Sequence, residues 1–269
     1  MPPELRIGSS SWSAPSWEGP FYPKGTLPAD YLPFYASEFD TVEVDATFYR
    51  TPSSRMVDAW HDRTPAGFLF AAKIPQVITH EKMLVGCEEE LAAFLKVMDR
   101  LGDKLGPLLF QFRYFKKSEL SEPDPFLDRL ERFLPTLPRD RRFAVEVRNK
   151  NFVTVRLLDL LRKHNVALAL IDHPWFYRID HLMSREGILT TDFVYLRWLG
   201  DRYKIEEQTK SWDRIIIDRQ REMERWIPAI RKMLEQSRAV YGYFNNHYAG
   251  YAVGSIRFFR ELYEPSSSA

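Results

Sequence analysis

Short apolar runs alternate along the chain with longer segments in which apolar residues recur at helical spacing. The runs predict eight strands, at 5–10, 41–45, 68–73, 107–112, 143–148, 166–172, 193–198 and 239–245. Apolar residues spaced i, i+3, i+4 and i+7 predict helices at 28–38, 53–63, 88–102, 124–135, 153–164, 212–236 and 250–263. The sixth gap, 173–192, lacks a clear helical pattern.

This strict alternation predicts an α/β fold: a single (β/α)8 TIM-type barrel over residues 1–264, with an irregular sixth helix. A doubly wound open sheet is the main alternative, and it should carry a glycine-rich phosphate-binding turn after the first strand. The chain has SSSWSAPSW at that place instead. The last five residues, 265–269, are predicted to form a disordered tail.

The second predicted strand, TVEVD, has one apolar face and one charged face. Successive side chains of a strand point to opposite faces, so its two valines share one face while Glu43 and Asp45 share the other. In a barrel the apolar face packs on the outer helices, and we therefore expect both acids to point inward. The fifth strand, FAVEVR, repeats the pattern with Glu146 and Arg148.

The same alternation predicts that further polar side chains point inward at the carboxyl ends of other strands. These are Lys73, Gln111, Asp172, Tyr195 and Arg197. An unpaired buried charge costs several kcal/mol, so such a cluster must be internally paired, hydrated, or in contact with a ligand. A salt-bridge network that only closes the barrel is the structural alternative. Convergence at the end where barrels carry their active sites favours a functional site.

The loops after the strands add aromatic and amide side chains. Trp12, Tyr49 and Trp175 follow the first, second and sixth strands, where they either pack within the loops or stack on a ligand ring. Asn245 and Asn246 follow the eighth strand and precede a predicted helix. Asparagine at a helix start is most often an N-cap, but the neighbouring Arg197 also makes an anion pocket a reasonable expectation.

Composition narrows the function classes. Lys and Arg number 38 against 37 Asp and Glu, so the chain has no overall basic bias of the kind that nucleic-acid binders often show. The single cysteine, Cys87, suits a reducing compartment, and the start of the chain shows no secretory signal pattern. No stretch approaches the roughly 20 apolar residues that span a bilayer. We expect a cytoplasmic protein with no membrane partner.

An ordered set of motifs resembles the YecE-like family, catalogued as domain of unknown function 72. It comprises GSSSW with FYP, TVEVDATFYR, the strand ending in Lys73, Thr79 with His80, Gln111, EVR at 146–148, YLRWLG and FNN, between about residues 7 and 262. The resemblance implies the (β/α)8 barrel and supplies no established reaction. It marks Trp12, Glu43, Thr47, Phe48, Tyr49, Lys73, Thr79, His80, Gln111, Glu146, Arg148, Asp172, Tyr195, Arg197, Asn245 and Asn246 as family positions.

Several positions depart from the pattern that the resemblance implies. Ser11 stands where glycine is usual, and Asp45 where asparagine is usual. Leu199 replaces a histidine, so a mechanism that needs a base or ligand at this position is excluded for this chain. A proline pair is replaced by Arg113 and Tyr114, and an aspartate by His247.

The favoured hypothesis is an enzyme, of hydrolase, lyase or isomerase type, that binds a small anionic ligand, phosphorylated or sugar-like. Its acid/base pair is Glu43 and Glu146, because burial can separate the pKa values of two carboxyls. The candidate catalytic residues are Glu43, Glu146, Lys73 and Asp172. The candidate binding residues are Trp12, Asp45, Tyr49, His80, Gln111, Arg148, Tyr195, Arg197, Asn245 and Asn246.

Two alternatives stay open. The first is a metal-dependent phosphodiesterase or nucleic-acid-binding protein resembling endonuclease IV, with a divalent metal held among Glu43, Glu146, Asp172, His80, His173 and His247. A metal is not favoured, because no two of these residues form a short ligand motif. The second alternative is a non-catalytic barrel that binds an anion or a partner.

Overall fold

The computed structural model describes residues 3–120 and 122–264 of the 269-residue chain. These residues form eight strands: β1 (Glu4–Ser9), β2 (Thr41–Val44), β3 (Leu69–Lys73), β4 (Leu105–Gln111), β5 (Phe143–Glu146), β6 (Val166–Asp172), β7 (Phe193–Trp198) and β8 (Ala239–Phe244). Each predicted strand is present, with ends that differ by a few residues. The predicted tail, 265–269, lies outside the described residues.

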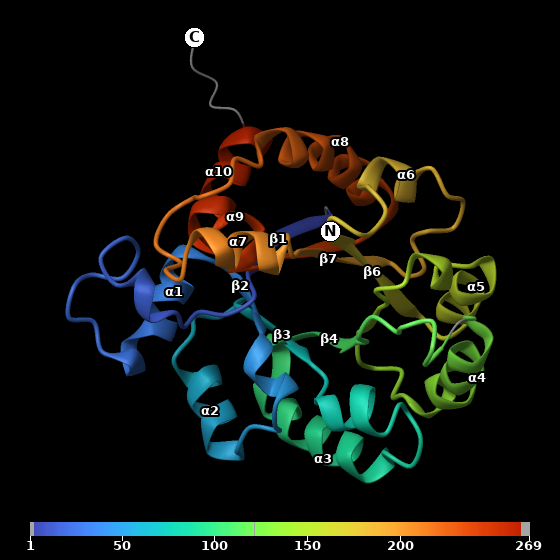
Figure 1. Cartoon of the computed structure of the whole chain (residues 1–269). Helices are drawn as coiled ribbons and strands as arrows, with labels where there is room; N and C mark the ends of the chain where they lie inside the picture. The colour runs from blue at the N-terminus through green and yellow to red at the C-terminus, as the bar shows by residue number, and fades with distance from the viewer. Residues whose placement is uncertain (1–2, 121, 265–269) are drawn as a thin grey trace.

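The strands form one parallel sheet in the order β1-β8-β7-β6-β5-β4-β3-β2, which curves into a nearly closed barrel (Figure 1). Helices lie around the outside of the strands, as expected when helical segments connect parallel neighbours. The predicted (β/α)8 class is therefore confirmed. Among the described residues no helix is long and apolar enough to cross a membrane.

The last gap in the barrel lies between β1 and β2, which no ladder of hydrogen bonds joins within the described residues. A side chain of the helix between them bridges it. The Tyr35 hydroxyl accepts from the Ser9 backbone N–H (2.9 Å) and from the Ser9 hydroxyl (2.8 Å), and it donates to the Thr41 carbonyl (3.2 Å). Gly8 allows the close approach, since a Cβ there would lie 2.1 Å from the Thr41 carbonyl oxygen.

The α-helices are α1 (Tyr31–Glu38), α2 (Ser54–Asp62), α3 (Glu88–Met98), α4 (Asp124–Phe133), α5 (Val155–Lys163), α6 (Ile179–Met183), α7 (Arg202–Gln208), α8 (Gln220–Gln236), α9 (Asn246–Ala249) and α10 (Ala252–Tyr263). The irregular sixth gap contains the five-residue α6. The helix predicted from residue 212 begins only at Gln220, and the sequence pattern missed α7. Ser53 and Thr154 cap α2 and α5, each accepting a backbone N–H with its hydroxyl oxygen.

The barrel interior is filled unevenly. Its buried side chains are small on β3, β5 and β6 and mostly aromatic on β7 and β8, with a leucine on β4: Ala71, Leu109, Ala144, Ala167, Ala169, Phe193, Tyr195, Ala239, Tyr241 and Tyr243. Small residues on one wall leave the volume that rings from the opposite wall occupy, which keeps the interior close-packed. Above this layer, at the carboxyl ends of the strands, the interior becomes charged. We call this end of the barrel the mouth.

Candidate functional site

A buried arginine links two buried carboxylates at the mouth. Arg197, on β7, donates from Nε (3.2 Å) and Nη2 (2.8 Å) to Oε1 of Glu43 on β2, and from Nη1 to Oε2 of Glu146 on β5 (2.7 Å). The side chains of both glutamates are 0% exposed, and that of Arg197 is 1% exposed. Strand alternation turns all three inward, as the sequence predicts. Two charge-assisted pairs share one guanidinium, which fixes its plane.

Tyr195 supports this cluster from below. Its hydroxyl donates to Oε2 of Glu43 (2.7 Å), and its ring lies 5.3 Å from the ring of Tyr243. Burial, followed by the charge of Glu43, raises the pKa of Tyr195 well above its usual value. Tyr195 therefore stays protonated and acts as a hydrogen-bond donor that orients Glu43.

Glu146 also contacts a second arginine, which reaches solvent. Arg148 donates from Nε to Oε1 of Glu146 (2.8 Å), and its side chain is 28% exposed. Burial raises the pKa of Glu146, but the positive charges of Arg197, Arg148 and Lys73 outweigh burial and lower it to about 2. Glu146 is therefore an ionised carboxylate held between two guanidinium groups.

Lys73 and Asp45 form the remaining ion pair of the mouth. The Lys73 ammonium also lies 5.5 Å from the centre of the Phe48 ring. Burial raises the pKa of Asp45, whereas Lys73 and Arg197 lower it by more, so the net shift is downward. The mouth thus holds three carboxylates and three cations, and its internal charges balance.

His80 lies at the edge of the mouth on a distorted segment. Val77–Glu81 is a single turn of π-helix, a rare form that often marks functional sites. Two non-glycine residues just after it, Met83 and Leu84, have φ values of 49° and 68°, which is strained backbone. Burial, then the charges of Arg113, Arg148 and Lys73, lower the pKa of His80 to about 4, so its imidazole is neutral at neutral pH.

His173, directly after β6, is a second neutral imidazole near the same arginine. Burial, followed by the charge of Arg148, lowers its pKa. Sequence reasoning named His173 only as a metal ligand and did not connect it with Arg148. Its place one residue after a strand end was the signal that could have found it.

Asp172 does not join the mouth, and its predicted inward orientation is wrong. Its neighbours Ala167 and Ala169 fill the barrel interior, so strand alternation turns Asp172 outward, toward α8. There its Oδ2 accepts from Nε1 of Trp226 (2.7 Å) and from the Tyr248 hydroxyl (3.4 Å). Burial raises its pKa, although the Trp226 hydrogen bond acts the other way.

Three other predicted residues make contacts within the protein. Trp12 packs edge-on against Trp60 (5.4 Å between ring centres) and joins the core outside the barrel. Oδ1 of Asn245 accepts from the backbone N–H of His247 (2.9 Å), and Oδ1 of Asn246 accepts from the backbone N–H of Ala252 (2.9 Å). Asn245 thus caps the short helix α9, which is the common role for this residue type, while Asn246 accepts the first backbone N–H of α10.

Asn245 and Asn246 nonetheless line a cavity of about 180 Å³ beside the mouth. Asp45 lines it as well, together with Ser10 and Trp17 from the loop after β1. Gln111 lies next to Glu146 in the register of β4 and β5, but its Nε2 donates to the Phe112 carbonyl (2.9 Å). The predicted binding residues therefore divide between the mouth, this cavity and the core.

Exposed aromatic side chains follow four different strands, three of them on loops and one on α7. Tyr49, Tyr114, Trp175 and Tyr203 are between 59% and 70% exposed and come after β2, β4, β6 and β7. We call these four residues the aromatic rim. Tyr114 and Tyr203 were not predicted. Exposed rings beside a charged site suit stacking on a planar or sugar ring of a ligand.

Comparisons with known proteins agree with the fold. The family model described as "Protein of unknown function DUF72" matches residues 6–269. The chain belongs to the DUF72 family. The resemblance inferred from the ordered motifs is thereby confirmed.

Curated relatives of this DUF72 chain carry uncharacterised-family names. The UPF0759 protein YecE of Escherichia coli is 30% identical over 148 residues, which is 55% of this chain and 50% of the relative. The matched region thus spans about half the length of that relative. The UPF0759 protein YunF of Bacillus subtilis is 23% identical over 96% of this chain and 94% of its own length.

Solved DUF72 structures share the fold. A DUF72 family protein of Thermotoga maritima aligns with a TM-score of 0.76 at 24% identity, over 97% of this chain and 99% of that one. One from Enterococcus faecalis aligns with a TM-score of 0.71 at 22% identity, over 98% and 97%. These structural similarities support the barrel fold, and they assign no activity to this chain.

Among the residues that the structure describes, a metal site of the kind considered from the sequence is not assembled. Within residues 3–120 and 122–264, no three His, Cys, Asp or Glu side chains are placed to hold a metal ion. His80 and His173 lie near the mouth, whereas His247 pairs with Glu206 (3.0 Å) and Asp172 faces α8.

Proposed function

We propose that the protein is an enzyme that binds a small anionic molecule, phosphorylated or sugar-like, at the mouth of the barrel and uses Glu146 for proton transfer. The proposal places the anion on Arg148 and the ring of the ligand against the aromatic rim. It leaves out Asp172, because that side chain faces α8.

The proposal rests on the Arg148 guanidinium, which reaches solvent. Only its Nε hydrogen bond to Glu146 engages a protein group among the described contacts, and the side chain is 28% exposed, in contrast to the 1% of Arg197. The remaining guanidinium nitrogens suit bidentate recognition of a phosphate or carboxylate. The neutral imidazoles of His80 and His173 stand in the field of the same charge and supply further hydrogen-bonding groups.

Anion binding at Arg148 gives Glu146 a route to base chemistry. With a pKa of about 2, Glu146 is too weak a base to take a proton near neutral pH. An anion that pairs with Arg148 offsets one of the positive charges that lower this pKa, and the proton affinity of Glu146 then rises only when ligand is bound. Glu43 and Tyr195 hold Arg197 in place during this change.

A thermal-shift screen of phosphates, phosphorylated sugars, nucleotides and divalent ions tests the binding step. A ligand that binds only the folded state stabilises it, by about 2.7 kcal/mol at a concentration of 100 Kd. The expected result is a rise in Tm with phosphorylated compounds for the wild-type protein and its loss in Arg148→Ala. Arg132→Ala is the matched control, since it removes one exposed positive charge from the last turn of α4, which contributes no residue to the mouth.

The catalytic step is tested with the ligand that the screen identifies. Glu146→Gln should keep ligand binding at Arg148 and lose turnover, because the amide oxygen can still accept from one of the two arginines whereas the amide cannot accept the proton. A variant that binds the ligand and turns it over like the wild type contradicts the assignment of Glu146. Binding without turnover in the wild type itself favours the non-catalytic barrel.

A further inference from the structure

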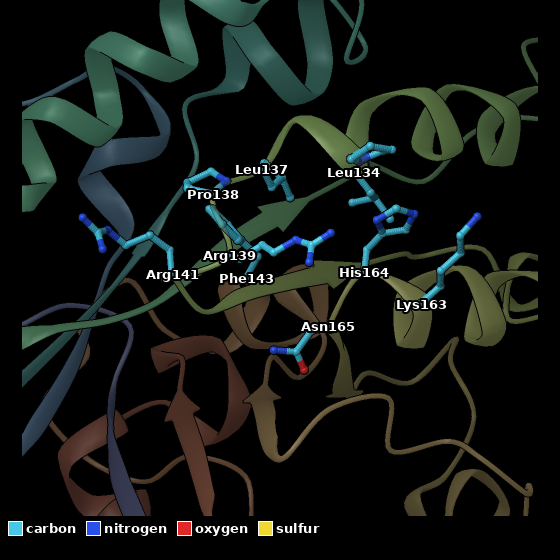
Figure 2. Close-up of a pocket in the computed structure, with 10 residues that line it drawn as sticks. Leu134, Leu137, Pro138, Arg139, Arg141, Phe143, Lys163, His164 and Asn165 are labelled. Carbon is cyan, nitrogen blue, oxygen red and sulfur yellow. The ribbon is translucent and has the colours of Figure 1, made fainter.

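A basic pocket lies at the opposite end of the barrel from the mouth. The cavity measures about 260 Å³ and is formed by the segment between α4 and β5 and by the end of α5. Arg139, Arg141, Lys163 and His164 line it, above the apolar floor made by Phe143. Figure 2 shows the Arg139 guanidinium extending toward the His164 ring, while the side chain of Arg141 extends the other way.

Two of the cations that line this pocket have no acidic partner among the residues that the structure describes. Arg141 is neutralised by Asp99 (2.8 Å) and Asp140 (2.6 Å). Arg139 and Lys163 are exposed, and no ion pair to either is found in the part of the chain that the structure describes. The pocket therefore carries uncompensated positive charge.

The acidic side chain on α4 that acts on His164 does not offset this positive charge. Glu131 acts on His164 from α4, but its carboxylate binds Arg156 (3.1 Å). The C-terminal end of α5 carries partial negative charge, which Lys163 partly offsets. Arg139 lies outside any helix, so this dipole does not account for it.

His164 lies in the field of the same excess positive charge. Its Nε2 is buried and has no hydrogen-bond partner among the described residues. Burial, then the charges of Lys163 and Arg139, lower its pKa, so the ring is neutral near neutral pH. An anion in the cavity would offset these charges and raise that pKa.

We propose that this pocket, formed by Arg139, Lys163 and His164, is a second binding site that takes a small phosphate-bearing anion. Its volume lies just below the range of about 300–1,000 Å³ typical of pockets for drug-sized ligands, which suits a small one. The site is separate from the mouth, because it lies where β5 and β6 begin, whereas Glu146 and Arg148 follow the end of β5.

Inorganic pyrophosphate is the probe, and the ring signals of His164 are the readout, at constant ionic strength adjusted with chloride. The chain has six histidines, so His164→Asn assigns the His164 signals in a proton NMR spectrum. Pyrophosphate should shift these signals in a saturable way and raise the pKa of His164. Arg148→Ala should leave this response unchanged, which separates the pocket from the mouth.

Two double variants decide the proposal. Arg139→Ala/Lys163→Ala should weaken the pyrophosphate response of His164 about tenfold or more, because charge-assisted hydrogen bonds are lost. Lys96→Ala/Arg132→Ala removes the same charge from exposed positions on α3 and α4 outside this pocket and should change the affinity less than about twofold. His164 signals that do not move at about 10 mM pyrophosphate, or that respond equally in both double variants, overturn it.

Discussion

Arg197 is the residue on which the geometry of the mouth depends. It is bound on two sides by Glu43 and Glu146, and none of the three has appreciable contact with solvent. Such a triad is held together by the mutual compensation of its charges, since removal of one partner leaves the others buried and unpaired. The side chains that define the site are therefore also side chains on which folding depends.

Arg197→Ala should lower the free energy of unfolding by about 3–5 kcal/mol, because it strands two buried carboxylates. Urea unfolding followed by circular dichroism measures the loss. Arg202→Ala, which breaks an exposed pair with Glu206 on α7, is the control and should cost far less. Equal losses in the two variants would mean that the mouth is hydrated and its charges do not depend on one another.

The depressed pKa of Glu146 predicts how stability changes in acid. A carboxyl whose pKa is lowered on folding stabilises the protein above its unfolded value, near 4.5, and this contribution is lost as pH falls toward about 2. The wild type should therefore exceed Glu146→Gln in unfolding free energy near neutral pH, and the difference should shrink below about pH 4.5. Urea unfolding of both proteins across this range measures it.

Glu207→Gln is the matched control for the acid experiment. Glu207 is exposed on α7, and it takes part in no ion pair within the residues that the structure describes. Its variant should track the wild type at each pH. A difference between wild type and Glu146→Gln that stays constant down to about pH 3 would contradict the ion pairing assigned to Glu146.

Alternation predicts a residue's orientation only where the two faces of a strand differ. TVEVD and FAVEVR have one apolar and one charged face, and the inward placement of Glu43 and Glu146 could be read from them. VALALID is apolar on both faces, so the sequence does not show which face points into the barrel. The predicted inward orientation of Asp172 is wrong for this reason. The pairing of Arg197 with both glutamates required the structure, because three strands distant in sequence contribute to it.

At the scale of elements, the closure of the barrel depends on a helix. Tyr35 of α1 supplies the hydrogen bonds that a ladder between β1 and β2 would otherwise make. This closure lies close to the mouth, since Ser9 ends β1 and Thr41 begins β2, two residues before Glu43.

Tyr35→Phe should lower the free energy of unfolding by about 1–3 kcal/mol, because the Ser9 backbone N–H and the Thr41 carbonyl lose the hydroxyl that bridges them. Tyr203→Phe removes a hydroxyl from a ring that is 70% exposed and should be nearly neutral. The denaturant midpoints of the two variants measure this difference in stability. A neutral Tyr35→Phe would show that water or a backbone shift replaces the bridge.

The elements that the sequence missed are those with little apolar pattern. In α7, RYKIEEQ, only Ile205 is buried, so no stripe of apolar residues marks the helix. The region 212–219 resembles a helix start in composition, but α8 begins at Gln220. Both differences from the sequence prediction fall between β7 and β8. In this segment Trp212 lines the cavity beside the mouth.

At the scale of the whole molecule, the fold places its apolar core and its buried charges in different regions. Apolar side chains fill the space between strands and helices, and small and aromatic residues fill the interior. The buried charged side chains Glu43, Lys73, Glu146 and Arg197 gather at the mouth. The order of strands and helices was enough to predict the (β/α)8 class. The ligand could not be predicted in the same way, because barrels with the same architecture carry many chemistries.

A structure of the protein with the most stabilising phosphorylated compound from the screen tests the central claim most directly. The account predicts that the phosphate lies at the mouth, with oxygens about 2.7–2.9 Å from the Arg148 guanidinium, and that the contact between Arg148 and Glu146 lengthens. A compound bound elsewhere, with the contacts among Arg148, Glu146 and Arg197 unchanged, would contradict it.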